Sequence, residues 1–503
     1  MPSILAYDVG TSGCKAAVVT TEGKLLSTAY LTYPTYYPQP LWAEQDPADW
    51  WQAVIDSTHQ VMQASHVEPA DILGLCFSTQ MVNAIPVDAQ GEPLGACISW
   101  LDGRAWEEAR MVMGKLGGPT IFGALIGTAI TGKDLLPKYL WMKRHDPDRY
   151  NQAAAIVDAS SYLLARATGR LVYEWTAASV TGMFHLKKKT WDTSLMRFLG
   201  LDREKFPDLV QSAEQVGGLT TRAAGELGLL QGTPVFGGAG DAMSAALGSG
   251  ACCEGEAHLC LGTSGFVGLV TARKVSGRRG LVSLQSADPQ KLLLIGEMET
   301  AGACLKWAAR QLYDSEPDAA ALSRMDADVN QIEPGAGSLL FTPWMYGERC
   351  PVPDESLRAA FINLGANHTR EQMARAVYEG VAYNLRWIVE LIQKNYGFPC
   401  EPLRVLGGGA RGLPWLRIIS DVSGRTLEAV ANPHVASVIG AAMIAAVGLK
   451  LVPSFEDIKT MVPVEHVIDP DGSLQPAYDR MYNAYRQVYN SLRGLYHDLN
   501  REE

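Results

Sequence analysis

Apolar and polar positions follow two spacings along the chain, and their mixture predicts both strands and helices. Residues 3–10, "SILAYDVG", are almost wholly apolar and end at a glycine, which predicts a buried strand. Residues 14–33 place apolar stretches on both sides of "TEGK", which indicates a β-hairpin. Residues 46–65 begin with Asp-Pro and carry apolar residues every three to four positions, as an amphipathic helix does. This mixture favours an α/β architecture.

One pattern occurs twice, about half the chain apart. Gly10-Thr11-Ser12-Gly13 recurs as Gly262-Thr263-Ser264-Gly265, and apolar stretches flank both copies. Two unrelated hairpin turns would explain so short an echo, but the matching flanks favour two related domains that face each other. We therefore expect domains over residues 1–245 and 246–503, with a polyphosphate held in the cleft between them.

Composition excludes several classes of partner. The net charge of −11 argues against nucleic acid and anionic membranes, because proteins that bind them usually cluster Lys and Arg. The longest clean apolar run, residues 438–449, is too short to span a bilayer, and the N-terminal residues lack the features of a signal peptide. The nine cysteines form no C-x-x-C pair, so we expect reduced thiols and a cytoplasmic protein.

The first turn combines groups that bind phosphate with a carboxylate that would repel it. Gly, Thr and Ser at 10–12 can offer backbone N–H groups and hydroxyls to phosphate oxygens, and Lys15 adds positive charge. Asp8, two residues before the turn, is compatible with phosphate if Mg²⁺ lies between them. The alternative is that Asp8 accepts hydrogen bonds from backbone donors of the turn.

A second carboxylate follows the predicted strand that ends in Gly237 to Gly240. Asp241 precedes an Ala-rich helix, and this position alone favours a helix cap. The functional hypothesis makes Asp241 the general base for a substrate hydroxyl. An ordinary Asp, with a pKa of about 4, is a weak base. Phosphoryl transfer asks little more, because positioning and charge neutralisation dominate it.

Three glycines, Gly407 to Gly409, follow the predicted strand at 403–406. Glycines allow the backbone to approach a flat ligand such as adenine closely. The segment matches neither the dinucleotide pattern G-x-G-x-x-G nor the Walker pattern, so a nucleotide site here would be of another kind.

The segment from Ser78 to Arg110 mixes hydrogen-bonding groups with a large ring. Gln80, Trp100, Asp102 and Arg104 would suit a polyhydroxylated substrate, whose hydroxyls need partners and whose C–H faces pack on aromatic rings. Alternatively, Trp100 is a core residue and Asp102 forms a structural ion pair with Arg104. For that pair, the structural interpretation is favoured.

Seven segments, in order, resemble motifs of the FGGY family of carbohydrate kinases, and most of all its xylulose kinase branch. They are "DVGTSGCK", "LWAEQDPADWW", "ISWLDGR", "LPKYLWMKRHDP", "GAGDAMSAALGSG", "YGERCPVPD" and "LGGGARGLPWLRIISDVSG". The resemblance covers about residues 4–450. It implies two actin-like, ribonuclease H-like domains, with ATP and Mg²⁺ meeting a small-molecule sugar in the cleft. It also suggests a homodimer.

The resemblance also implies roles for single residues. Asp241 would be the catalytic base beside the sugar, and Asp8 would act through Mg²⁺ near the phosphates. The N-terminal domain would bind sugar and phosphate, and the C-terminal domain the nucleotide. By motif match, the residues that would line the phosphate path are Gly10, Thr11, Ser12, Lys15, Gly262 and Thr263. Those that would hold the nucleoside are Gly302, Gly408, Gly409 and Ala410. Those on the sugar side would be Gln80, Met81, Val82 and Trp100.

Two departures from the family pattern bear on the substrate. Xylulose kinases typically carry His where this chain has Val82, and losing an imidazole partner can change substrate preference greatly. Glycerol kinases typically carry Arg-Glu at Met81 and Val82, so glycerol is disfavoured. "SLRAAF", residues 356–361, lacks a usual glycine, a change we interpret as structural. D-xylulose is the favoured substrate, with ribulose, gluconate or a tetritol as alternatives.

An actin-like ATPase switch is the rival from another class, because it could share the phosphate turns and the repeat. It does not explain "ISWLDGR" or "YGERCPVPD". A sugar sensor without catalysis is a weaker rival, since a binder needs neither Asp8 nor Asp241.

Overall fold

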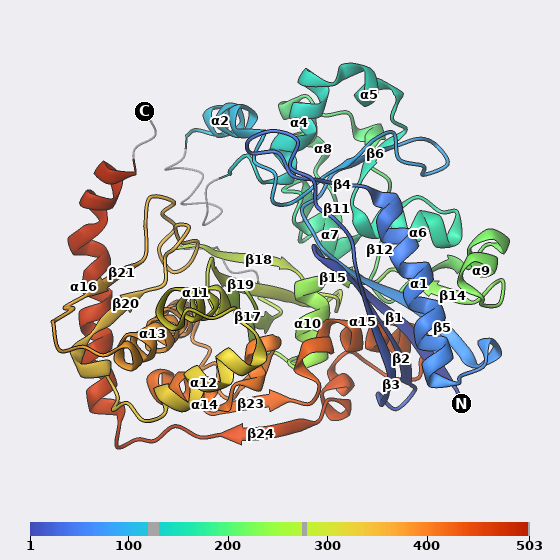
Figure 1. Cartoon of the computed structure of the whole chain (residues 1–503). Helices are drawn as coiled ribbons and strands as arrows, with labels where there is room; N and C mark the ends of the chain where they lie inside the picture. The colour runs from blue at the N-terminus through green and yellow to red at the C-terminus, as the bar shows by residue number, and fades with distance from the viewer. Residues whose placement is uncertain (119–129, 274–278, 501–503) are drawn as a thin grey trace.

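The computed structural model describes residues 1–118, 130–273 and 279–500, and it has two lobes, each built around one mixed sheet (Figure 1). Strands of the first sheet lie in the order β13 (Gln215–Gly218), β14 (Pro234–Phe236), β5 (Ile72–Thr79), β1 (Ser3–Val9), β2 (Gly13–Thr20) and β3 (Leu25–Thr32), with β15 (Ala239–Gly240) beside β5. Strands of the second lie in the order β18 (Leu281–Gln285), β19 (Leu292–Met298), β17 (Gly265–Thr271), β16 (Ala257–Leu261), β22 (Leu403–Leu406), β23 (Leu427–Val430) and β24 (Val464–Ile468).

The two sheets share one connectivity. From β3 to β13, successive neighbours pair antiparallel, antiparallel, parallel, parallel and antiparallel. The series from β19 to β24 is the same. The Gly-Thr-Ser turns occupy equivalent places, because one joins β1 to β2 and the other joins β16 to β17. The repeated tetrapeptide therefore marks a duplication of a whole α/β sheet, and the predicted two-domain fold is confirmed.

Two helices pack against each other between the sheets (Figure 1). Helix α10 (Asp241–Ser249) contacts β16 and β22 of the second sheet, whereas α15 (Ala436–Gly448) contacts β1 and β5 of the first. Their backbones approach closely, since a Cβ at Gly440 would collide with Ser244 O and one at Gly248 with Ala436 O. One core, to which both halves of the chain contribute, therefore joins the lobes.

Strand β1 shows how the first sheet is covered on both faces. Leu5, Tyr7 and Val9 belong to the core beneath α1 (Pro47–Ser65), while Ile4 and Ala6 belong to the core shared with α10 and α15. Since side chains alternate along a strand, Asp8 points to the same side as Ile4 and Ala6. The register of β1 thus directs this carboxylate between the lobes.

The predicted helix over residues 46–65 is confirmed as α1, which begins one residue later, at Pro47. Asp46 is its N-cap and accepts a hydrogen bond from Ala48 N at 2.9 Å. Trp50 and Val54 are fully buried in the core that α1 shares with the first sheet. The predicted hairpin is also confirmed, as β2 and β3.

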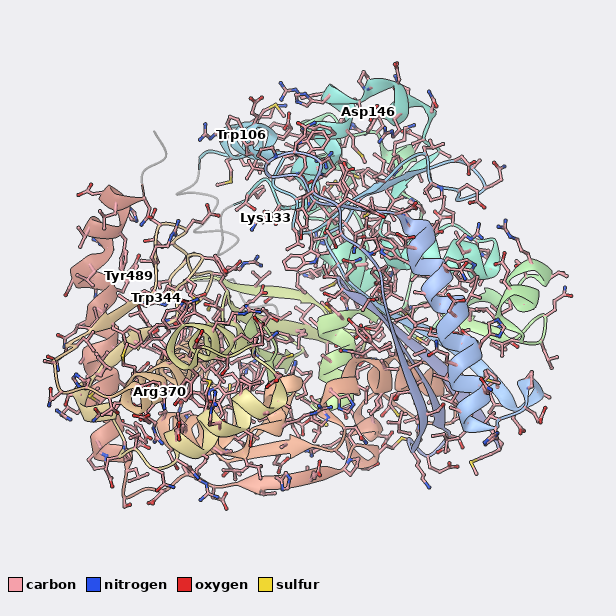
Figure 2. All side chains as sticks on the ribbon, in the orientation of Figure 1. Trp106, Lys133, Asp146, Trp344, Arg370 and Tyr489 are labelled. Carbon is pink, nitrogen blue, oxygen red and sulfur yellow. The ribbon has the colours of Figure 1, made fainter. Side chains whose placement is uncertain are left out.

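The other helices pack around the lobes, and α2 (Trp106–Lys115) and α4 (Leu135–His145) contribute to a separate core of the first lobe. In the second lobe, the long α13 (Arg370–Tyr396) is buried along most of its length. Trp344 and Tyr489 meet edge to face where α16 (Gln475–Leu499) packs on the lobe (Figure 2). No helix in the described ranges has the length and apolar character needed to cross a membrane, and none of the nine cysteines is in a disulfide. The main helices are α2 (Trp106–Lys115), α4 (Leu135–His145), α6 (Ala159–Thr168), α9 (Thr221–Leu227), α11 (Gly302–Tyr313), α12 (Ala319–Val329), α13 (Arg370–Tyr396), α14 (Leu413–Ser423) and α16 (Gln475–Leu499).

Candidate active site

The ends of three neighbouring strands bring the two candidate carboxylates close together. Strand β5 lies between β1 and β15, so that Ser78 is paired with Asp8 on one side and with Ala239 on the other. Asp241 follows β15 directly and begins α10. Asp8 and Asp241 therefore flank the end of one strand, near enough for the charge of Asp8 to act on Asp241.

Asp8 is mostly buried and has side-chain partners. Ser78 Oγ donates a hydrogen bond to its Oδ1 at 3.1 Å, and Lys15 Nζ lies 3.9 Å from its Oδ2. Burial raises the pKa of Asp8, while Lys15 and Ser78 oppose that rise. The partners recorded within the described residues are thus side chains, not the backbone donors of the turn that the alternative interpretation required.

Asp241 is the first residue of α10, and Gly240 is the N-cap. The helix-cap interpretation of Asp241 is therefore wrong by one position, although Ala242 N does donate to its Oδ1 at 2.8 Å. Burial raises the pKa of Asp241 to about 7, and the charges of Asp8 and Glu297 contribute to the rise. A carboxyl group that titrates near neutrality is well matched to accepting a proton from a hydroxyl.

The first turn is tied to the segment predicted to hold sugar. Trp100 Nε1 donates to Thr11 Oγ1 at 2.8 Å, and Gln45 Nε2 donates to Thr11 O at 2.8 Å. The Thr11 hydroxyl accepts from Trp100 and so keeps its own O–H free to donate. Ser12 is exposed at the tip of the turn, and Lys15 is half-buried on β2.

The second turn lies against a helix. Gly262 N donates to Ser264 O, two positions on, at 3.0 Å, whereas Gly10 N in the first turn donates to Gly13 O, three positions on, at 3.0 Å. The N-terminus of α11 closes over this turn, because Gly302 N donates to Gly262 O and Ala303 N to Thr263 O, both at 3.0 Å. Gly302 thus lies directly beside the second Gly-Thr-Ser turn.

The three-glycine segment lies next to this turn, because β22 pairs with β16. Its residues differ in what they leave open. A Cβ at Gly409 would come within 2.7 Å of Trp415 Cζ3, so packing alone requires glycine there. A Cβ at Gly408 would meet no atom within 4 Å, and Gly408 is exposed. Ala410 is buried in the core, so its backbone is the part that could face a ligand.

The sugar-side residues follow β5 and reach the neighbourhood of Asp241. Gln80 is buried, and its Nε2 donates to Gln45 Oε1 at 2.8 Å, whereas its Oε1 has no partner in the described part of the chain. Met81 Sδ fills the position that a side chain at Gly240 would need. Val82 has a φ of 61°, in the left-handed region that β-branched residues rarely adopt. Strained backbone of this kind is concentrated at functional sites.

Asp102 and Arg104 form the structural ion pair that the sequence favoured. Asp102 is fully buried, and its Oδ2 accepts from Arg104 Nη2 at 2.7 Å and from Ala43 N at 2.6 Å. Arg104 also pairs with Glu44 at 2.7 Å and lies 3.5 Å from the centre of the Trp42 ring. This pair braces the segment that carries Trp100.

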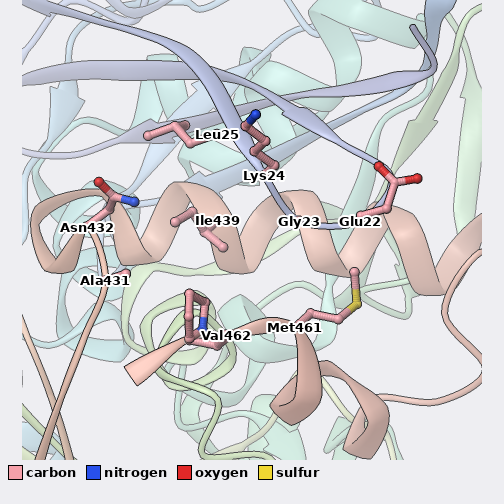
Figure 3. A pocket seen from close by; sticks show the side chains of 10 residues that line it. Glu22, Gly23, Lys24, Leu25, Ala431, Asn432, Ile439, Met461 and Val462 are labelled. Carbon is pink, nitrogen blue, oxygen red and sulfur yellow. The ribbon is translucent and has the colours of Figure 1, made fainter. Parts of the chain in front are cut away.

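Neither of two surface cavities is lined by Asp8 or Asp241, although Glu44, the partner of Arg104, lines the second of them. One, of about 330 Å³, lies between the β2–β3 turn and residues 461–463, beside Asn432 and Ile439 (Figure 3). The other, of about 520 Å³, lies near Tyr36 and Asp46. Within the described ranges, the residues that could jointly hold a metal by spacing alone are Glu107, Glu108 and His145, and Arg144 already pairs with Glu108.

Comparisons with known proteins identify the family. Residues 3–248 match the N-terminal domain of the FGGY family of carbohydrate kinases, and residues 257–449 match its C-terminal domain. The chain belongs to the FGGY family of carbohydrate kinases. FGGY kinases are sugar phosphotransferases, so the chain is an enzyme and the actin-like switch is set aside.

Its similarity to individual FGGY kinases extends over most of its length. It is 30% identical over 459 residues to a xylulose kinase of Staphylococcus xylosus, covering 91% of this chain and 93% of that one. It is 27% identical to a gluconokinase of Bacillus subtilis, over 92% and 91% of the two chains. The crystal structure of a xylulose kinase from Rhodospirillum rubrum superposes with a TM-score of 0.89 at 27% identity, covering 98% of this chain and all of the other.

The residues present fit the groups that an FGGY kinase uses. Gly408 leaves open space where a flat ring could approach the backbone, and each Gly-Thr-Ser turn has exposed residues. Asp8 and Asp241 supply hard oxygen ligands whose mutual repulsion a divalent cation would relieve. Asp8 is the residue that would hold Mg²⁺.

Sequence reasoning missed the residues that support Asp241 in this FGGY kinase. Glu174 is buried and accepts hydrogen bonds from Thr176 and Ser212, and Thr176 Oγ1 in turn accepts from Gly240 N at 2.8 Å. Burial raises the pKa of Glu174 to about 7. No local motif marks this network, because Ser212 lies 38 residues from its partner Glu174 and Gly240 lies 64 residues from its partner Thr176. Arg358, in the "SLRAAF" departure, donates to Glu355 O and Leu357 O, as a structural role requires.

Proposed function

We propose that this FGGY kinase transfers the γ-phosphoryl group of ATP to a hydroxyl of a ketose or polyol, and that D-xylulose is the favoured acceptor. The observation that carries the proposal is the pair Asp8 and Asp241 at adjoining strand ends, with the pKa of Asp241 raised to about 7. The similarity to xylulose kinases supports the choice of sugar.

In the proposed reaction, Asp241 orients the acceptor hydroxyl and takes its proton. The hydroxyl oxygen forms a bond to the γ-phosphorus as the bond from phosphorus to the bridging oxygen of ADP breaks, and the negative charge leaves with ADP. Mg²⁺ held by Asp8 would neutralise charge on the phosphate oxygens. Thr11, Lys15 and the backbone N–H groups of the two turns would hold those oxygens in line.

Gluconate is the main alternative acceptor, because a gluconokinase is nearly as similar to this chain. Val82 is the residue that bears on the choice, since valine cannot make the hydrogen bond that a histidine there would make. Ribulose and a tetritol are further alternatives.

A test is ADP release, coupled to a visible readout, with Mg·ATP and a panel of D-xylulose, D-ribulose, D-gluconate, erythritol and glycerol. We expect D-xylulose to give the highest kcat/KM and Asp241→Asn to lose turnover with every sugar. A higher kcat/KM with gluconate would overturn the choice of sugar. A rate of ATP turnover that is the same without sugar as with each sugar of the panel would overturn the kinase proposal.

A further inference from the structure

Lys138 is a fully buried lysine near the sugar-side residues, in the segment "LPKYLWMKRHDP" to which no role has been given. It lies on α4, which starts two residues after Lys133; Lys133 lies on the side of the first lobe that is turned toward the second (Figure 2). The Lys138 ammonium donates to Val82 O at 3.1 Å and to Ser99 O at 2.8 Å.

These two carbonyls belong to the two loops that carry the candidate sugar contacts. Val82 lies in the loop after β5, together with Gln80 and Met81, and Ser99 directly precedes Trp100. Trp100 is itself bonded to Thr11 of the first phosphate turn. One ammonium group thus connects both sugar-side loops, and the second loop is hydrogen-bonded to the phosphate turn through Trp100.

Trp141, one turn further along α4, contacts the second loop from the same helix face. Its ring meets Trp42 edge to face with centroids 5.4 Å apart, and the Arg104 guanidinium lies 4.9 Å from its centre. Residues three apart on a helix lie on one face, so Lys138 and Trp141 act on the same neighbouring segment. This face of α4 therefore packs against the loops that approach the substrate.

Burying an ammonium group in this space costs free energy, because burial disfavours its charge. An apolar side chain would pack here without that cost, but it could not hold two carbonyls. The carbonyl that accepts from Lys138 belongs to Val82, whose backbone is in the strained left-handed conformation. Hydrogen bonds from a charged donor are stronger than those from a neutral one.

We propose that Lys138 is a positioning residue that fixes the two sugar-side loops. It therefore sets the affinity for sugar and has a much smaller effect on the affinity for ATP, which it reaches only through the hydrogen bond from Trp100 to Thr11. The inference rests on the proposed function, because it takes these loops as the sugar site. It assigns no chemical step to Lys138, which lies behind the loops.

The charge of Lys138 gives the inference a pH signature. Burial lowers the pKa of Lys138 to about 8, against the opposing effect of Asp102, Asp134 and Cys97 and with the added effect of Arg104. Above pH 8 the neutral amine would hold the carbonyls less firmly. The KM for sugar should therefore rise about fourfold at pH 8.5, as the charged fraction falls, while the KM for ATP should change by less than about twofold.

The test compares Lys138→Met, Lys138→Arg and a control, Lys143→Met, on the exposed side of the same helix. We expect Lys138→Met to raise the KM for the responding sugar about tenfold with an ATP KM within twofold of wild type, and Lys138→Arg to restore part of the affinity. Lys143→Met, which loses a surface pair with Asp202, should match wild type. An unchanged sugar KM in folded Lys138→Met would overturn the inference.

Two further measurements keep the inference testable. If Lys138→Met fails to fold, the wild-type KM for sugar between pH 7 and 9 decides, and a flat profile overturns the inference. If no sugar in the panel responds, the proposed function fails, and hydrogen exchange then tests Lys138 alone. Amide exchange at residues 80–84 and 98–102 should rise in Lys138→Met, and unchanged exchange there would overturn the inference.

Discussion

Replacing Asp241 by Asn should make the protein more stable and inactive at the same time. The substitution keeps the shape of the side chain and removes a charge that burial, Asp8 and Glu297 all disfavour. The folded state near pH 7.5 therefore carries a cost that the unfolded chain does not. Catalytic groups often destabilise the fold that holds them.

The magnitude follows from the pKa of Asp241, which moves from 3.8 to about 7. At 1.36 kcal/mol for each pH unit, this difference corresponds to about 4 kcal/mol. Asp241 is partly exposed, so solvent screens some of the cost, and a gain of about 2–3 kcal/mol is expected. For a cooperative unit of this size, that gain raises Tm by about 2–6 °C.

The sign of the effect fixes its pH dependence. Because the folded-state pKa is raised, the stability linked to Asp241 is fully present below pH 3.8 and is lost as pH rises to about 7. The advantage of Asp241→Asn should therefore grow between pH 4 and 7 and level off above 7. Thermal unfolding of both proteins across that range measures it.

A matched control is Asp318→Asn, at the exposed N-cap of α12, where asparagine can cap equally well. We expect it to leave the difference in Tm close to zero at every pH. A difference in Tm for Asp241→Asn that is constant from pH 4 to 8 would refute the assignment of a raised pKa to Asp241.

Four further outcomes are expected. The kcat/KM of the wild type should fall tenfold for each pH unit below about 7 as Asp241 takes up a proton, which a pH–rate profile checks, and a limb near pH 4 would contradict it. Asp8→Asn should raise the Mg²⁺ concentration needed for half-maximal turnover. In a double-mutant cycle followed by thermal unfolding, it should also reduce the stabilisation gained from Asp241→Asn, because the charge of Asp8 raises the pKa of Asp241. Additive effects would show that the two carboxyls do not interact. Val82→His should increase the ratio of kcat/KM for D-xylulose to that for D-gluconate, and a constant ratio would remove this position from substrate choice. Trp100→Phe leaves the Thr11 hydroxyl without its donor and should lower kcat/KM about fivefold, which corresponds to the roughly 1 kcal/mol of one hydrogen bond. Unaltered kinetics would contradict this prediction.

The sequence predicted local elements well because their signals are local. The apolar run at 3–10, the "TEGK" turn and Asp46-Pro47 each specify a strand, a hairpin or a helix start within a few residues, and the structure has them as β1, β2–β3 and α1. The repeated tetrapeptide predicted the duplicated sheet for a similar reason, since both copies keep their apolar flanks.

The remaining features depend on contacts between distant residues. Lys138 reaches Val82 across 56 positions, and Gly240 is held by Thr176 across 64. The left-handed backbone of Val82 has no sequence signature either, because valine normally avoids that region. Asp241 was misplaced as a cap for a related reason: the choice between it and Gly240 is made by β15 pairing with β5.

Helix α15, from the C-terminal half of the chain, packs against the sheet of the N-terminal half, and this has a consequence for synthesis on the ribosome. The inner face of the first sheet, with Ile4, Ala6 and Val19, is covered by α15, whose residues 436–448 are made about 190 residues after the end of the N-terminal half at residue 245. At about 5–20 residues per second, the finished N-terminal half waits roughly 10–40 s for this cover. During that interval an apolar sheet face is open to other nascent chains, so the N-terminal half expressed alone should depend on chaperones or aggregate.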